Sequence, residues 1–299
     1  MNKQLAFVLS GGGARGALQV GALRALLEAN IQPDLMVGTS IGAINATYMA
    51  VRGVRADSVA TLAQVWLEAA ANDLLTSNYL WATLNTLLNR SSGGVYKRMR
   101  DFIVAHGLSP DLRFGDIHGV RLIVVAADLN AGRPVLYGHD PQQSVLEAVL
   151  ASAALPPWIT PLEKGEQLLI DGGIVSNLPI EAALAQGATE IIALDLADSR
   201  DVPVKTRGWL SFLVKLTNTA QQRQTELELA LAAARKVSVR YMALCGAEPV
   251  AVWDFHRAEE LIARGYEIAR REIAQWQPER PAGWLRRQIS NIKSQISRS

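Results

Sequence analysis

The chain has 299 residues, of which 49% are apolar and 19% are charged, an ordinary composition for a globular protein with a large buried core. Its formal net charge of +2 argues against a nucleic-acid-binding protein, and its single cysteine excludes an internal disulfide. The apolar run at 5–9 is short and leads into glycines, so we expect neither a signal peptide nor a membrane-spanning segment, but a cytoplasmic protein.

Strand and helix patterns alternate from the N-terminus. Residues 5–9 have the apolar character of a buried strand, and residues 17–29 have that of an apolar helix. A second strand is expected at 35–37, followed by a helix that starts just after Ser40. Two successive strand–turn–helix units are typical of the start of a parallel sheet, so we predict one α/β domain.

Further elements are expected along the rest of the chain. Residues 57–106 have a helical pattern, within which an apolar cluster at 79–88 either packs between helices or covers a lipid site. Residues 226–237 are rich in Ala, Leu and Glu and predict another helix. Strands are expected at 121–126, 134–137, 167–170, 191–194 and 249–253.

A glycine-rich turn, Gly11-Gly12-Gly13-Ala14-Arg15-Gly16, separates the first strand from the first helix. Glycine lets backbone N–H groups converge on one point, and the helix adds the positive end of its dipole, so the turn favours negative charge. The spacing also fits the dinucleotide fingerprint G-x-G-x-x-G, but the second strand ends without the acidic residue that would hold a ribose. A dinucleotide-dependent oxidoreductase and a purely structural turn are the two alternative interpretations.

The second motif, Gly38-Thr39-Ser40-Ile41-Gly42, matches G-x-S-x-G between a strand and a helix. In this motif a strained turn exposes the serine hydroxyl and the flanking glycines relieve crowding, so Ser40 is a candidate nucleophile. A serine needs a general base. Among the four histidines, His256 is the best placed for a triad, because it lies between a predicted strand and a helix.

Asp171 is the other candidate base. Asp171-Gly172-Gly173 follows the apolar strand expected at 167–170. Ligands collect at the carboxyl ends of the strands in open parallel sheets, so Asp171 and Ser40 are expected at one edge. The two glycines permit the backbone geometry that brings a carboxylate and a serine together. An aspartate in an ordinary turn is the alternative interpretation.

The glycine-rich turn, the serine elbow and the Asp-Gly-Gly motif together resemble the patatin-like phospholipase family over about residues 5–195. The segment 151–156, Ala-Ser-Ala-Ala-Leu-Pro, is also similar to the one that precedes the catalytic aspartate in that family. The resemblance implies a three-layer α/β fold with a mostly parallel central sheet flanked by helices. It also implies a dyad in which Ser40 is the nucleophile and Asp171 is the base.

The resemblance further implies an oxyanion hole formed by the backbone of Gly11, Gly12 and Gly13. Arg15 lies in the same loop, where it either steadies the loop, attracts a phosphate, or is simply solvated. The remaining motif glycines are Gly16, Gly38, Gly42, Gly172 and Gly173.

The implied function is hydrolysis of a lipid acyl ester, of the phospholipase A or lysophospholipase type, with a phospholipid or another acyl ester as substrate. An acyltransferase that uses the same Ser40 acyl-enzyme is the alternative. The sequence has no cluster of residues with metal-ligand spacing, so we expect no metal and no cofactor.

The C-terminal segment 276–299 is expected to follow a hydrolase domain that occupies residues 1–275. Between 280 and 299 there are five basic residues and no acidic ones. Apolar residues recur there at helical spacing, which predicts a basic amphipathic helix. Such a helix either contacts an anionic membrane peripherally or packs on the domain.

Overall fold

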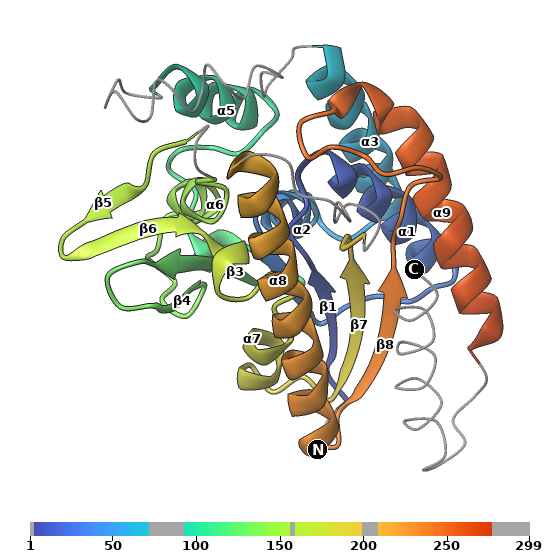
Figure 1. Cartoon of the computed structure of the whole chain (residues 1–299). Helices are drawn as coiled ribbons and strands as arrows, with labels where there is room; N and C mark the ends of the chain where they lie inside the picture. Colours follow the sequence, from blue (N-terminus) through green and yellow to red (C-terminus); the bar gives the residue numbers. More distant parts are fainter. Residues whose placement is uncertain (1–2, 72–92, 156–158, 199–208, 277–299) are drawn as a thin grey trace.

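The computed structural model describes residues 3–71, 93–155, 159–198 and 209–276 (Figure 1). In this part of the chain, eight strands form one sheet. The strands are β1 (Leu5–Leu9), β2 (Leu35–Thr39), β3 (Arg121–Asp128), β4 (Arg133–Tyr137), β5 (Leu162–Lys164), β6 (Gln167–Asp171), β7 (Glu190–Asp195) and β8 (Ser238–Ala243). The helices are α1 (Ala17–Glu28), α2 (Ile41–Arg52), α3 (Ala56–Ala71), α5 (Gly93–Ala105), α6 (Val145–Ser152), α7 (Ile180–Ala185), α8 (Trp209–Ala234) and α9 (Ala258–Gln275).

Helices cover both faces of the sheet, which confirms the expected three-layer α/β fold. Side chains alternate along a strand, so each strand contributes to two separate cores. In β1, Phe7 and Leu9 face the core that includes α1, α2, α3, α6 and α9. Ala6 and Val8 face the core that includes α7 and part of α8, the two helices drawn in front of the sheet in Figure 1.

The sheet is mixed, which refines the expectation of a mostly parallel one. Strands β3, β2, β1, β7 and β8 lie side by side and are all parallel. Strands β4, β5 and β6 are antiparallel to their neighbours. The antiparallel strands occupy one end of the sheet, where short turns connect β3 to β4 and β5 to β6.

Strand β6 lies directly beyond the end of β2. The first part of β3 pairs with β2, up to Val125 opposite Thr39. The last part of β3 pairs with β6, from Ala126 opposite Asp171. Strand β4 pairs with β3 over both parts and so occupies the other side of β3, which leaves β2 and β6 on the same side. Because β6 runs antiparallel to β3, its C-terminal residue, Asp171, faces the C-terminal end of β2.

Most elements expected from the sequence are confirmed, but the strand expected at 249–253 is wrong. The edge strand is β8, which follows α8 after a short turn and pairs with β7. Residues 249–253 form an irregular loop that lies against the glycine-rich turn, with the Val252 carbonyl accepting a hydrogen bond from the Ala14 amide at 2.8 Å. The segments 79–88 and 280–299 lie outside the described residues. None of the helices that the structure describes has the length and apolar character that crossing a bilayer requires.

Helices α1 and α9 cross in backbone contact at two glycines. A Cβ on Gly265 would lie 1.9 Å from the Leu18 carbonyl oxygen, and one on Gly21 would lie 1.9 Å from the Ile262 carbonyl oxygen. These contacts bring α9, which comes late in the chain, against the first helix (Figure 1).

Gly265→Ala is therefore expected to lower the free energy of unfolding by about 2–3 kcal/mol, because neither backbone can move away without disturbing the core. Urea unfolding measures this change. Gly94→Ala is the matched control, since that helical glycine has only the end of Arg98 near its Cβ position, at 3.8 Å. The control is expected to keep or slightly raise stability, and equal losses in the two variants would contradict the proposed crossing.

Candidate active site

Ser40 lies on a strained turn between β2 and α2. Its backbone has φ 55° and ψ −124°, a conformation that non-glycine residues rarely adopt. The turn is tight enough to need its flanking glycines. A Cβ on Gly38 would lie 2.4 Å from the Gly42 carbonyl oxygen, and one on Gly42 would lie 2.3 Å from the Leu9 carbonyl oxygen. The Ser40 side chain makes no capping hydrogen bond to α2, so its hydroxyl is free to face another partner.

That partner is Asp171. The Ser40 hydroxyl donates to Asp171 Oδ2 at 2.5 Å, and the Gly173 amide donates to Asp171 Oδ1 at 2.8 Å. Asp171 is only 5% exposed. The C-terminal ends of β2 and β6 face each other. Ser40 directly follows β2 and Asp171 is the last residue of β6, so the two residues lie close together. The sequence predicted this proximity, but from two parallel strands rather than from an antiparallel insertion.

Burial changes the acidity of Asp171. Loss of solvent raises the pKa of its carboxyl to about 6, against the opposing effects of the hydrogen bonds from Ser40 and Gly173. A carboxylate with this pKa is a stronger base than an ordinary aspartate and still carries its charge at neutral pH.

If Asp171 acts as the general base, activity requires its ionised form. We therefore expect kcat/KM to rise with pH, to be half-maximal near pH 6, and to reach a plateau above neutrality. A pH–rate profile on an ester with a non-titrating leaving group measures this. A midpoint near the ordinary aspartate value of about 4 would contradict the effect of burial.

Ser152 and Ala154, close together in the chain, accept hydrogen bonds from the backbone amides of Ser40 and Asp171. The Ser40 amide donates to the Ser152 hydroxyl at 2.8 Å, and that hydroxyl donates to the Val125 carbonyl at 2.6 Å. The Asp171 amide donates to the Ala154 carbonyl at 3.0 Å. Ser152 is fully buried and lies at the end of α6. Ser152 and Ala154 thus support the positions of Ser40 and Asp171, a role that the sequence motif did not reveal.

The glycine-rich turn lies beside Ser40. A Cβ on Gly11 would be 3.1 Å from the Ser40 Cβ. The Gly11 amide already donates to the Asn177 carbonyl at 3.1 Å, so it is not available to an oxyanion, contrary to the prediction from the sequence. The amides of Gly12 and Gly13 donate no hydrogen bond within the described residues. The oxyanion hole proposed below is therefore limited to Gly12 and Gly13.

Arg15 supports the same turn. Its Nε donates to the Gly12 carbonyl at 3.3 Å, which favours the interpretation that this side chain steadies the loop. Gly13 has φ 57°, and a Cβ there would lie 2.2 Å from the Val252 carbonyl oxygen. The loop at 249–253 therefore fixes the outer side of the turn.

Helix α8 holds the loop that follows Asp171, through side chains spaced along one face. Gln221 Nε2 donates to the Gly173 carbonyl at 3.2 Å, and Gln224 Nε2 donates to the Ile174 carbonyl at 2.8 Å. One helical turn further on, the buried carboxyl of Glu228 accepts from the Ser176 hydroxyl, and burial raises the pKa of Glu228 to about 7. No motif in the sequence pointed to these three residues, because they act through a helix distant in the chain.

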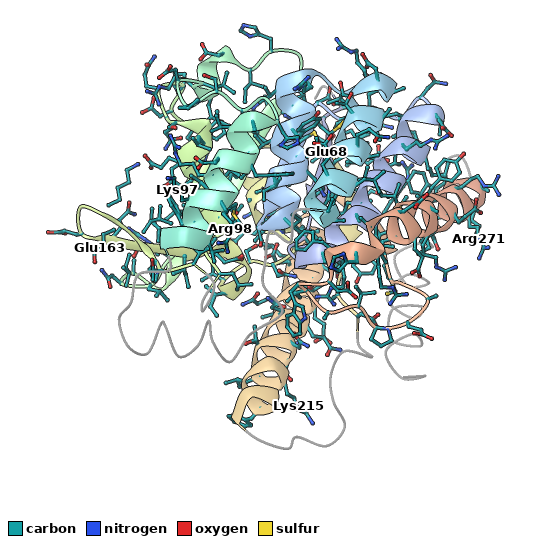
Figure 2. The ribbon with its side chains drawn as sticks, turned by 90° about the horizontal axis from the view of Figure 1, so that it is seen from above. Glu68, Lys97, Arg98, Glu163, Lys215 and Arg271 are labelled. Atoms are coloured by element: carbon teal, nitrogen blue, oxygen red, sulfur yellow. The ribbon has the colours of Figure 1, made fainter. Side chains whose placement is uncertain are left out.

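An apolar cavity of about 100 Å³ lies along α2 and has Ile41, the residue after Ser40, in its lining; neither Ser40 nor Asp171 is among its lining residues. Its walls come mainly from α2, α3 and α5, which stand beside one another when the molecule is viewed from above (Figure 2). Ile44, Leu62 and Trp66 are among the apolar lining residues, and Arg52 and His106 also line it. A cavity of this character is suited to a hydrocarbon chain.

The alternative assignments are less well supported by the geometry. His256 is exposed in the short 3-10 turn Phe255–Arg257, and no hydrogen bond to Ser40 or Asp171 is found for it. Asp34 precedes β2 and accepts from the Leu5 amide, so it lies at the opposite end of the strands from the glycine-rich turn. Among the described residues, no group of three or more metal-ligating side chains is arranged to hold a metal ion.

A family model of patatin-like phospholipases matches residues 7–184, a stretch that includes both Ser40 and Asp171. The match covers more than half of the chain, so the chain belongs to the patatin-like phospholipase family.

Two curated relatives and one solved structure illustrate the similarity. An uncharacterized NTE family protein of Mycobacterium tuberculosis is 32% identical over 212 residues, which are 71% of this chain and 33% of that protein. Patatin-like phospholipase domain-containing protein 6 of Homo sapiens is 30% identical over 207 residues, which are 68% of this chain and 14% of that protein. This chain thus matches only a third or less of the length of these relatives.

The solved structure is human GIVD cytosolic phospholipase A2 in complex with methyl gamma-linolenyl fluorophosphonate. It superposes with a TM-score of 0.50 at 12% identity, covering 91% of this chain and 58% of that one. At this identity the superposition supports the α/β fold alone.

Proposed function

We propose that this protein hydrolyses lipid acyl esters, as a phospholipase A or lysophospholipase, with Ser40 as nucleophile and Asp171 as general base. The observation that carries the proposal is the 2.5 Å hydrogen bond from the Ser40 hydroxyl to the buried Asp171 carboxylate. The apolar cavity lined by Ile41 and other residues of α2, the helix that begins next to Ser40, supports a lipid acyl group as the part of the substrate that is bound.

The reaction proceeds in two steps. Asp171 takes the hydroxyl proton as Ser40 Oγ attacks the ester carbonyl, and the Gly12 and Gly13 amides stabilise the oxyanion. The intermediate collapses to a Ser40 acyl-enzyme, and Asp171 gives its proton to the departing alcohol. A water molecule then attacks the acyl carbon as Asp171 takes its proton. Release of the fatty acid returns the proton to Ser40.

The surroundings of Asp171 allow an aspartate, which is normally a weak base, to act as the general base. An aspartate removes a proton from a hydroxyl only when the developing charges are well stabilised and water is kept away. Asp171 is buried, its pKa is raised, and both of its carboxylate oxygens accept hydrogen bonds. The positive end of the α2 dipole lies at Ser40 and adds to the stabilisation of the oxyanion.

The test is product analysis with a lysophospholipid and with short- and long-chain p-nitrophenyl esters. We expect release of free fatty acid, faster from long-chain esters because of the cavity. Adding glycerol or a thiol as acceptor separates the acyltransferase alternative, which would divert the acyl group to the acceptor. Failure to cleave any ester would contradict the proposed function.

A further inference from the structure

Two amide side chains are buried next to the glycine-rich turn. Gln19 on α1 and Asn45 on α2 are both fully buried, in helices whose other buried residues are mostly apolar. The two amides are hydrogen-bonded to each other, with Asn45 Nδ2 donating to Gln19 Oε1 at 3.0 Å. Burying an amide is costly unless its hydrogen bonds are satisfied, so the other partners of this pair explain why it is there.

The pair holds the glycine-rich turn at both of its ends. Gln19 Nε2 donates at 2.9 Å to the carbonyl of Ser10, the residue just before the turn. Asn45 Nδ2 donates at 3.0 Å to the carbonyl of Gly16, the last residue of the turn. The two amides proposed for the oxyanion hole lie between these carbonyls in the chain. The hydrogen bond between Gln19 and Asn45 therefore ties the start of the turn to its end.

A third side chain fixes the orientation of both amides. Trp66 Nε1, which can only donate, donates to Asn45 Oδ1 at 3.0 Å. The Asn45 oxygen thus faces the indole, and its NH₂ group faces the turn and Gln19. Because the Gln19 oxygen accepts from Asn45, its NH₂ group faces the backbone and donates to the carbonyls of Ser10 and, at 3.2 Å, Leu194. Every N–H group of the two amides has an acceptor, so neither amide can turn over without losing hydrogen bonds.

We propose that Gln19 and Asn45 are positioning residues for the oxyanion hole, which hold the turn so that the Gly12 and Gly13 amides stay directed at the oxyanion. This inference rests on the proposed function, because it takes those two amides as the donors. It goes further by assigning an effect on the reaction rate to two side chains of the core. Oxyanion donors work because they are fixed before the reaction, and a displacement of about 1 Å can cost about 10²-fold in rate.

The test measures kcat and KM on a long-chain p-nitrophenyl ester. Gln19→Met keeps the length of the side chain but donates no hydrogen bond, and it is expected to lower kcat by about 10–10²-fold with little change in KM. Asn45→Leu releases the other end of the turn and is expected to act in the same way. Gln19→Asn, which keeps an amide but shortens it by one methylene, serves if the apolar variants do not fold.

Thr189→Val is the matched control. Thr189 Oγ1 accepts from the Gln4 amide at 2.8 Å at the opposite end of β1 and β7, so the variant loses a side chain–backbone hydrogen bond away from the turn. It is expected to lose stability and to keep the wild-type kcat. Thermal unfolding shows that each variant is folded.

A double variant shows whether Gln19 acts through the turn. Gly13→Ala displaces the turn directly, since a Cβ there would lie 2.2 Å from the Val252 carbonyl oxygen. Adding Gln19→Met to Gly13→Ala is therefore expected to lower kcat little further. Wild-type kcat in folded Gln19→Met, a loss that adds in full to that of Gly13→Ala, or an equal loss in Thr189→Val would overturn the inference. If the wild-type protein cleaves no ester, or cleavage survives Ser40→Ala, the proposed function itself fails.

Discussion

Ser40→Ala and Asp171→Asn are each expected to lower kcat/KM on a long-chain acyl ester by at least about 10³-fold. Ser40→Ala removes the attacking oxygen. Asp171→Asn keeps the shape of the side chain but removes the group that accepts the proton at 2.5 Å. Because the two residues act as one unit, the double variant is expected to be no worse than either single variant. Steady-state kinetics with a chromogenic ester measures all three.

Thermal unfolding separates lost chemistry from lost structure. The folded-state pKa of Asp171 is raised to about 6, so its contribution to stability is fully present below the unfolded value of about 3.8 and is lost as the pH rises through 6. At neutral pH, Asp171→Asn removes a buried charge and is expected to melt at or above the wild-type temperature.

His256→Ala is expected to keep its activity. Loss of activity in that variant, with full activity in Asp171→Asn, would identify a histidine-based triad instead.

Gly13→Ala is expected to lower kcat by about 10²–10³-fold, the usual cost of losing one oxyanion donor. Gly13 has φ 57°, and an added Cβ would lie 2.2 Å from the Val252 carbonyl oxygen. The turn must therefore shift, and the Gly12 and Gly13 amides move away from the oxyanion position. KM is expected to change little, because in the proposed mechanism these amides bond the oxyanion more strongly than the substrate carbonyl.

Gly132→Ala controls for backbone strain. Gly132 has φ 62°, close to that of Gly13, but nothing lies within 4 Å of its Cβ position, and the residue lies in the turn between β3 and β4. Gly132→Ala therefore restricts the backbone in the same way as Gly13→Ala, but at a position away from the candidate active site. The control is expected to lose some stability and no activity. Equal losses of kcat in the two variants would show that the Gly13 effect comes from destabilisation alone.

Local sequence patterns predicted most of the fold. Local apolar runs and glycine positions are enough to predict the apolar strands, the glycine-rich turn after β1 and the helix after Ser40. The structure confirms these elements. The mixed sheet was not predictable in the same way, because strand direction depends on pairing between distant segments. The error at 249–253 has a related cause: its apolar residues pack against the glycine-rich turn rather than in the sheet, and the edge position is taken by β8.

The candidate site was predictable only in part. Ser40 and Asp171 lie in recognisable motifs, and the structure places them within hydrogen-bond distance. The engagement of the Gly11 amide by Asn177, and the support from Gln221 and Gln224 on α8, depend on tertiary contacts that leave no local pattern in the sequence.

Covalent labelling shows whether Ser40 is the nucleophile and whether Asp171 activates it. The wild-type protein is treated with a long-chain alkyl fluorophosphonate, which reacts with an activated serine, and the labelled peptide is located by mass spectrometry. We expect a single label on Ser40, no label in Ser40→Ala, and much slower labelling in Asp171→Asn. A label on another residue, or labelling of Asp171→Asn at the wild-type rate, would contradict it.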